Sequence, residues 1–305
     1  MEPLDVAFGL AARTTLCDAF SHARSSIVVE FHHLDDACVI NSLNAAATRT
    51  EHPVSVEVHV EKFPSRYRHN PGAQRHDERA LATLRSKLDP HIRLIADDDP
   101  DVLMHAKAAV VDGQTAFIAT ANATTSGFGD AGDILVTTHD PSDIAAVDAS
   151  VHGSIVAADH VVTGPDASLR LRLRELMAAS GDLRVATEDL SDPEMVRTLA
   201  QRSAHGHHDR VLLESAHASR AQRLAERQLR GAGVDVRSLD SGYMHEKYVD
   251  TGDRIYLGSA NLTHNGIDEA REVGVIAAPS AFGAGADALR RAFDAMWSGA
   301  HQVVA

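Results

Sequence analysis

The sequence predicts an α/β fold made of two similar halves, and two observations predict it. The first is a polar signature that occurs twice, and the second is an alternation of strand-like and helix-like segments that recurs in both halves. A chain of 305 residues can bury a large core, so we expect the halves to fuse into one bilobal globular unit. We expect the first half at residues 1–165 and the second at residues 166–305.

Each copy of the signature has a histidine, a lysine two residues later, an asparagine further on, and an acid 11 residues beyond the asparagine. The members are His105, Lys107, Asn122 and Asp133 in the first copy and His245, Lys247, Asn261 and Glu272 in the second. The histidines stand 140 residues apart, and the asparagines and the acids each stand 139 apart. Near-constant spacing at three polar positions indicates an internal duplication.

Local geometry brings the groups of one copy together. If residues 105–111 form a strand, His105 and Lys107 point to the same side. Asp112-Gly113 is typical of a hairpin turn, which leaves Asn122 in the loop after the returning strand, near the histidine. An imidazole, a fixed positive charge and an amide donor in one small volume can hold the oxygens of a phosphate and attack its phosphorus.

Two copies supply two imidazoles, and phosphodiester cleavage needs two. One histidine attacks the phosphorus and forms a phosphohistidine, while the other protonates the departing oxygen and then deprotonates the incoming water or alcohol. We expect Asp133 to orient the ring of His105 and Glu272 to orient that of His245, as the carboxylate of a hydrolase triad does. Because the lysines and asparagines stabilise the phosphate, this chemistry requires no metal or other cofactor.

The doubled His-x-Lys pattern, followed by an aspartate and then by a small-residue element ending in asparagine, resembles the phospholipase D superfamily of phosphodiesterases and phosphatidyltransferases. The resemblance covers roughly residues 25–298 and is most specific in Gly-Ser-Ala-Asn at 258–261. It implies that two mixed β-sheets flanked by helices pack across a pseudo-twofold axis, with one active site at their interface. It also implies that His105 is the nucleophile and His245 the general acid.

The sequence departs from the family pattern at two places. The small-residue element of the first copy is Ala-Thr-Ala-Asn at 119–122, which keeps the asparagine. In the second copy Gly252 replaces the aspartate that the first copy has at Asp112. Asp250 lies five residues after His245, an odd offset like the seven residues from His105 to Asp112, so it takes the strand face that Asp112 takes. Asp250 is therefore the favoured substitute, with Asp253 as the alternative. The residues that we expect to support the site are Asp112, Asp250, Ser259 and Thr120.

The two halves show the same series of elements. We expect strands at residues 26–31, 54–60, 92–95, 105–111, 115–119 and 134–138, and again at 183–186, 211–213, 234–236, 245–249, 255–257 and 273–277. Helices are expected between them, including residues 77–88 and 219–230. A further helix at residues 169–180 is expected to bridge the halves, with its arginines on the outer face.

Positive and aromatic side chains alternate between residues 62 and 79, although the formal net charge of the chain is −14. That net charge argues against broad binding of polyanions. The segment follows an expected strand and can form a loop at the rim of the site, where Arg66, Arg68 and Arg75 would bind single-stranded nucleic acid or another phosphate-rich substrate. An ordinary solvated loop is an equal alternative.

The remaining histidines and the cysteines carry weaker signals. His205, His207 and His208 lack the cysteine or paired spacing of a metal site, so we expect a solvated loop. The pair His32-His33 ends a strand-like run and can lie at the edge where the site forms. Cys17 and Cys38 have no metal or redox spacing and are expected to be inert thiols.

The expected function is that of a metal-independent phosphodiesterase acting on nucleic acid or a soluble phosphodiester, with no oligomer needed to complete the site. The alternatives are a phospholipase D or phosphatidyltransferase acting on phospholipids, and a catalytically weak phosphate-binding component. No apolar run approaches the roughly 20 residues of a membrane span, and the N-terminus lacks the features of a secretory signal. We therefore expect a cytoplasmic protein without stable membrane insertion.

Overall fold

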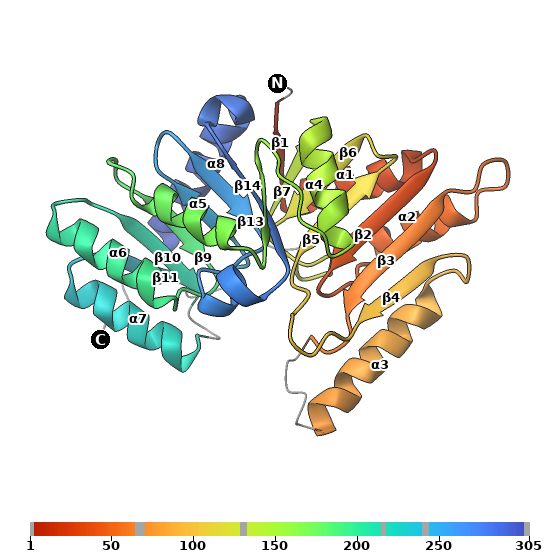
Figure 1. Ribbon diagram of the computed structural model, residues 1–305, viewed down its shortest axis with the longest axis horizontal. Coiled ribbons are helices and arrows are strands. Elements are labelled where there is room, and N and C mark those ends of the chain that lie inside the picture. The colour runs from red at the N-terminus through yellow and green to blue at the C-terminus, as the bar shows by residue number, and fades with distance from the viewer. Residues whose placement is uncertain (1–2, 65–70, 129–132, 215–217, 240–243, 302–305) are drawn as a thin grey trace.

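The structure is a computed structural model that describes residues 3–64, 71–128, 133–214, 218–239 and 244–301. Figure 1 shows two halves side by side, the first in red to yellow-green and the second in green to blue, each built on a sheet with helices packed against it. Each sheet has seven strands and mixes parallel with antiparallel pairs. The predicted α/β fold of two similar halves is confirmed.

The first sheet has the spatial order β1-β7-β6-β5-β2-β3-β4. Its strands are β1 (Asp5–Phe8), β2 (Ser26–Phe31), β3 (Ser55–Glu61), β4 (Arg93–Asp97), β5 (Lys107–Val111), β6 (Thr115–Ala119) and β7 (Ile134–Thr138). Its helices are α1 (Gly9–His22), α2 (Ala37–Ala47), α3 (Pro71–Lys87) and α4 (Pro141–Val151). Strands β2, β3 and β4 run parallel, and β5, β6 and β7 form an antiparallel meander that continues to β1.

The second sheet has the order β11-β10-β9-β12-β13-β14-β8. Read from the other edge, as β8-β14-β13-β12-β9-β10-β11, it matches the first sheet strand for strand. Its strands are β8 (Val161–Gly164), β9 (Arg184–Thr187), β10 (Arg210–Glu214), β11 (Asp235–Leu239), β12 (Lys247–Asp250), β13 (Ile255–Gly258) and β14 (Glu272–Ala277). Its helices are α5 (Ala167–Met177), α6 (Pro193–Ala204), α7 (Arg220–Gly231) and α8 (Ala284–Gly299), with a π-helical turn at Asn265–Glu269 and a 3₁₀ turn at Pro279–Phe282. Each expected strand is present, with ends that differ by at most three residues, whereas β1 and β8 were not predicted.

The helix expected at residues 169–180 is α5, and it lies within the second half rather than between the halves. It packs on β8, on α6 and on the turn Asn265–Glu269. Arg170 does not face outward, because its guanidinium contacts the carboxylates of Asp192 and Asp268, at 2.7 Å from Asp192. The expected division after residue 165 falls just beyond β8, which already pairs with β14 of the second sheet.

A core shared by both halves holds the two sheets together. Successive residues of β5 alternate between its two faces. Ala109 and Val111 join the core under α1 and α2, whereas Ala108 and Val110 join a cluster that includes Tyr248 and Val275 of the second half. The central strands β5 and β12 are therefore buried on both faces, and the segments that precede them meet at the interface between the halves.

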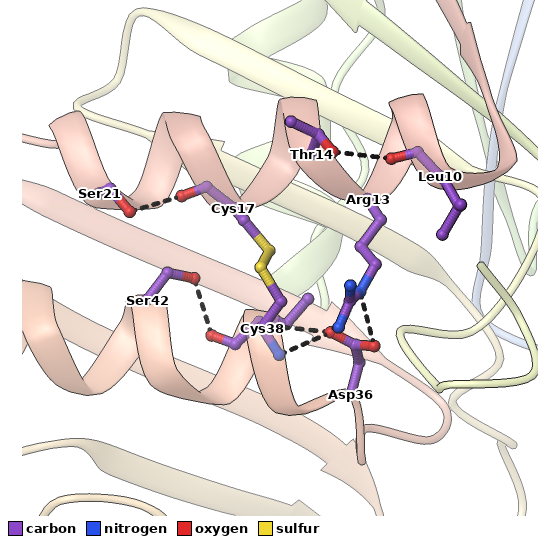
Figure 2. Close-up of a disulfide and its surroundings, with 9 residues drawn as sticks. Leu10, Arg13, Thr14, Cys17, Ser21, Asp36, Cys38 and Ser42 are labelled. Atoms are coloured by element: carbon purple, nitrogen blue, oxygen red, sulfur yellow. Dashed lines mark hydrogen bonds and ion pairs between the residues drawn. A yellow bond between two sulfur atoms is a disulfide. The ribbon is translucent and has the colours of Figure 1, made fainter. Parts of the chain in front are cut away.

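Helices α1 and α2 lie side by side and are joined by a disulfide between Cys17 and Cys38 (Figure 2). The expectation of two inert thiols is wrong, because helix packing brings together two cysteines that carry no sequence motif, with their Cα atoms 6.2 Å apart. Asp36 caps α2 by accepting hydrogen bonds from two backbone N–H groups, and Arg13 of α1 contacts the same carboxylate at 2.9 Å. Among the described helices, none is long and apolar enough to cross a membrane.

Candidate active site at the interface of the halves

The two signature histidines lie just before β5 and β12, in the segments where the halves meet. The backbone N–H of His105 donates to the carbonyl of Arg271 at 2.9 Å, and the N–H of Arg271 donates to the carbonyl of Leu103 at 2.7 Å. The Arg271 side chain also forms ion pairs with Glu30 and Asp97 of the first half. These contacts tie the start of β14 to the first half and place Glu272 beside His105.

The carboxylates pair with the histidines across the interface rather than within each copy. Nδ1 of His105 lies 2.7 Å from Oε1 of Glu272, and Nδ1 of His245 lies 4.0 Å from Oδ1 of Asp133. The expected pairing of Asp133 with His105 and of Glu272 with His245 is therefore not the arrangement found. The reason is geometric: a strand order repeated about a twofold axis makes each acid nearer to the histidine of the opposite half.

Glu272 is held from two sides in a fully buried position. The hydroxyl of Ser259 donates a hydrogen bond to its Oε2, and Nδ1 of His105 is hydrogen-bonded to its Oε1. Burial alone would raise the pKa of Glu272, but the neighbouring His105 and Lys107 outweigh it and lower that pKa. A charged carboxylate fixed in this way holds the His105 ring with its Nδ1–H toward Glu272, which leaves the lone pair of Nε2 available.

Both imidazoles favour the neutral form in the substrate-free protein. Burial is the main reason why the pKa of His105 is lowered. Burial, together with the adjacent Lys247 ammonium, lowers the pKa of His245 to about 3. A neutral ring is the nucleophilic form of histidine, and a bound phosphate anion would raise the pKa of a neighbouring ring and favour its protonation.

The two lysines lie in equivalent positions but have different neighbours. Nζ of Lys107 donates to the carbonyl of His105 at 2.6 Å, and Nζ of Lys247 donates to the carbonyl of His245 at 2.6 Å. Lys247 also contacts the Glu188 carboxylate at 2.8 Å. Burial lowers the pKa of Lys107 to about 7, so its charge is present mainly below neutral pH.

The two asparagines sit in matched loops that glycine makes possible. Thr124 accepts a hydrogen bond from the N–H of Gly127, and Thr263 accepts one from the N–H of Gly266 in the same way. A Cβ at Gly127 would lie 2.3 Å from the Asn122 carbonyl oxygen, and one at Gly266 would lie 2.7 Å from that of Asn261. Any larger residue at either glycine would clash with that carbonyl oxygen and displace the loop that carries the asparagine. The repeated Asn-x-Thr-x-x-Gly pattern is a part of the duplication that the sequence reasoning missed.

His32 and Glu188 occupy equivalent positions beside the two motifs. His32 follows β2, and its ring centre lies 4.9 Å from that of His105. Glu188 follows β9 and contacts Lys247. The equivalence is supported by the next residue in each half: the N–H of His33 donates to Oδ1 of Asn122 at 3.3 Å, and that of Asp189 donates to Oδ1 of Asn261 at 3.4 Å. His32 was noted from the sequence as lying at the edge of the site, and Glu188 was missed.

Two cavities meet at His32. The first has a volume of about 220 Å³ and is lined by polar groups, among them His105, Asn261 and Glu272. The second has a volume of about 210 Å³ and is mainly apolar, with Ile40, Val60 and Leu84 in its wall. A substrate bound at His105 would therefore find a polar compartment on one side of His32 and an apolar one on the other.

The four residues expected to support the site divide into two pairs. Asp112 lies at the far end of β5, in the predicted hairpin turn, where its carboxylate accepts three backbone N–H groups at residues 24–26. Asp250 ends β12 and is bound by Arg290 at 2.8 Å, and the alternative Asp253 accepts from the hydroxyl of Thr251. These acids thus brace strand ends away from the histidines.

Ser259 and Thr120 form the second pair and lie at the site itself. The hydroxyl of each accepts a backbone hydrogen bond from the start of a neighbouring strand. The N–H of Ile134 donates to Thr120 at 3.0 Å, and the N–H of Val273 donates to Ser259 at 2.9 Å. The carbonyl of Thr120 also lies 3.4 Å from Nζ of Lys247. Of the basic residues expected at the rim, Arg66 and Arg68 lie outside the described residues, and Arg75 is exposed on α3.

Two of the groups of histidines and acids that could hold a metal contain none of the signature residues. Glu57, His59 and His152 place one ligand atom each within 4.8 Å of one another, but Arg93 binds Glu57 at 2.7 Å and opposes a cation there. His207 belongs to another such group with Asp182 and Asp209, and Asp209 is already bound by Arg202. Among the described residues, no such group includes the signature histidines or the full cluster at residues 205–208.

These features define a two-histidine site shared by duplicated α/β halves. The family model described as "Cardiolipin synthase, PLD-like domain" matches residues 16–152 and 173–297, and the chain therefore belongs to this family of phospholipase D-like proteins. The resemblance inferred from the two motifs is confirmed. No curated protein matches the sequence.

Solved structures support the same fold. Phosphatidylserine synthase from Haemophilus influenzae Rd KW20 aligns with a TM-score of 0.69 and 13% identity, over 98% of this chain and 89% of its own. Polyphosphate kinase from Porphyromonas gingivalis aligns with a TM-score of 0.59 and 16% identity over 87% of this chain, which spans only 45% of that kinase. Nuc from Salmonella typhimurium, a phospholipase D family member, covers 48% of this chain at 16% identity and a TM-score of 0.42. At these identities the first two likenesses show the fold.

Proposed function

We propose that the protein is a metal-independent phosphodiesterase that works through a phosphohistidine on His105. The observation that carries the proposal is the pairing of His105 with the buried Glu272 at 2.7 Å, in a polar cavity that also holds Asn261. The contact fixes the tautomer that presents Nε2 to a substrate. His245, whose Nδ1 lies 4.0 Å from the Asp133 carboxylate, supplies the second imidazole that the proton transfers need.

The proposed reaction has two steps, the formation and the hydrolysis of the phosphohistidine. Nε2 of His105 attacks the phosphorus, the bond from phosphorus to the leaving oxygen breaks, and that oxygen takes a proton from His245. Water then gives a proton to His245 and attacks the phosphorus, which breaks the bond to His105 and releases the phosphate product. An alcohol in place of water would make the same site a transferase. Lys107, Lys247, Asn122 and Asn261 stabilise the charge on the non-bridging oxygens.

The substrate that we propose is a nucleic acid or a soluble phosphodiester. Arg75 on α3 supports it as a cationic contact, while the net charge of −14 limits how extended a polyanion the surface can hold. A phospholipid is the second candidate, because the apolar cavity of about 210 Å³ beside His32 can take a hydrocarbon segment. The likeness to phosphatidylserine synthase over 98% of this chain agrees with this candidate at the level of the fold.

A substrate screen in the presence of EDTA tests the proposal. We expect turnover of at least one of bis-p-nitrophenyl phosphate, single-stranded DNA, RNA and phosphatidylcholine, with no loss when the chelator is in excess. Parallel assays with added glycerol separate transfer from hydrolysis. Activity that EDTA removes and a divalent ion restores would contradict the two-histidine mechanism, and turnover of phosphatidylcholine alone would favour the second candidate.

A further inference from the structure

The carboxylate of Glu188 contacts the two groups of the second motif that would stabilise a phosphate oxygen. Its Oε2 accepts from Nζ of Lys247 at 2.8 Å and lies 3.2 Å from Nδ2 of Asn261. The lysine and the asparagine of this copy are the groups that stabilise phosphate oxygens in the proposed reaction. One carboxylate oxygen thus receives both donors.

The ammonium of Lys247 is further engaged by backbone. Besides Glu188 it lies 2.6 Å from the carbonyl of His245 and 3.4 Å from that of Thr120, which matches its three N–H donors with three acceptors. Its positive charge is therefore already offset by a carboxylate before any substrate arrives. A phosphate placed at Asn261 would lie beside the negative charge of Glu188.

The first half has no carboxylate at the equivalent position. There the chain carries His32, whose Nδ1 lies 2.9 Å from the carbonyl of Met104 and whose ring packs against His105. The two sides of one site thus differ by a full negative charge, although their backbones match. This difference in charge lies beside the reacting atoms. It can therefore decide which charge state of phosphate the site accepts.

We propose that Glu188 is a specificity-determining residue that makes the site accept monoanionic phosphodiesters and reject dianionic phosphate monoesters. The inference rests on the proposed function and deepens it. A diester carries one negative charge, whereas a monoester above its second pKa near 6 carries almost two. The Coulomb energy between unit charges a few ångströms apart in a partly buried site is large enough to weaken the dianion substantially, and the cost grows with each added charge.

Direct binding of two small probes to the full chain tests this assignment. Dimethyl phosphate and methyl phosphate differ by one charge, and both can be titrated by ³¹P NMR at about pH 7.5, where the monoester is mainly dianionic. In Glu188→Gln the amide still accepts from Lys247 and Asn261, so the fold should persist. We expect methyl phosphate to bind at least about tenfold more tightly to this variant than to the wild type, while dimethyl phosphate changes by less than about threefold.

Two further variants sharpen the test. Glu175→Gln removes one negative charge from the exposed face of α5 and should leave the ratio of the two affinities unchanged. His32→Glu adds a carboxylate at the equivalent position of the first half and should weaken methyl phosphate further. An unchanged affinity ratio in Glu188→Gln, or an equal loss for both probes, would overturn the proposal.

The binding measurement separates this inference from the proposed catalytic function. If the wild type cleaves diesters but Glu188→Gln does not change the affinity ratio, the charge selection fails and the phosphodiesterase assignment stands. If no diester is cleaved but the ratio shifts as expected, the site selects phosphate charge without catalysis, and the phosphodiesterase assignment fails.

Discussion

The two halves share a strand order, yet the surroundings of their histidines differ. His105 has a carboxylate at 2.7 Å and a second imidazole packed on its ring, whereas His245 has its carboxylate at 4.0 Å and lies beside a lysine bound to Glu188. The loop that carries the asparagine is preserved in both halves down to its glycine. The backbone of the duplication has been kept while the side chains around it have diverged, which suits two histidines with different tasks.

Removal of each histidine in turn should give the largest difference in activity between the two halves. We expect His105→Ala to lose at least about 10³-fold in kcat on both natural and activated diesters, because no nucleophile remains. His245→Ala should keep a measurable burst on bis-p-nitrophenyl phosphate, since p-nitrophenolate leaves without protonation, and should accumulate an acid-labile phosphohistidine. Rapid-quench kinetics and intact-mass analysis measure both. The reverse pattern would exchange the roles, and equal residual activity in both would rule out a covalent histidine.

Removal of the charge from each acid gives the next largest contrast. Glu272→Gln should lower kcat by about 10²-fold to 10³-fold, because the amide can no longer stabilise the His105 tautomer and imidazolium. Asp133→Asn should cost about tenfold, since its carboxylate stands 4.0 Å from the His245 ring. Steady-state kinetics on one diester, with thermal unfolding as the control for the fold, compares the two. A larger loss for Asp133→Asn would show that the closer contact is structural.

The pH dependence distinguishes the two lysines. Because burial lowers the pKa of Lys107 to about 7, its ammonium is charged below that pH and neutral above it. We therefore expect kcat/KM to fall as the pH rises through about 7, by up to about tenfold for each unit beyond it. Lys107→Gln should be less active and lack this alkaline decline, whereas Lys247→Gln should retain it. A decline that persists in Lys107→Gln would assign it to another group.

The smallest expected effect on activity concerns the link between the helix pairs. In the first half α1 and α2 are joined by the Cys17–Cys38 disulfide, and in the second half Arg170 joins α5 to the start of α6 through ion pairs with Asp192 and Glu194. Cys17→Ser should lower the free energy of unfolding by about 3 kcal/mol, with kcat changed less than about twofold. Urea unfolding with and without reductant measures this change.

Thiol titration provides the check on that pair. Two titratable thiols in the native protein purified without reductant would contradict the link. Because disulfides persist mainly in oxidising compartments, titration in rapidly quenched cell extracts also tests the expected cytoplasmic location.

The repeated apolar runs and the doubled signature together predicted the fold, because buried strands such as β5 and β10 contain the apolar runs at residues 108–111 and 211–213. Strands β1 and β8 escaped prediction because each has only four residues and is defined by its pairing at a sheet edge. Their sequences carry too little alternation to distinguish them from loops.

The candidate site was predicted in its doubled signature residues but not in the pairing of their acids with their histidines. Constant spacing identified eight polar residues, yet spacing along the chain does not reveal which acid meets which histidine across a twofold interface. Glu188 was missed for a related reason: 57 residues separate it from His245, whereas 73 separate His32 from His105, so a fixed offset does not align them. Alignment of the strand ends that precede each motif would have revealed the pair.

The tie between Arg271 and the first half has a consequence for when the proposed site is assembled during synthesis. His105 is translated long before Glu272, and the backbone bonds of Arg271 to Leu103 and His105 form only once the start of β14 exists. A growing chain that has completed its first half therefore exposes a histidine without its carboxylate. The histidine that we propose as the nucleophile therefore acquires its partner carboxylate only after most of the chain has been made.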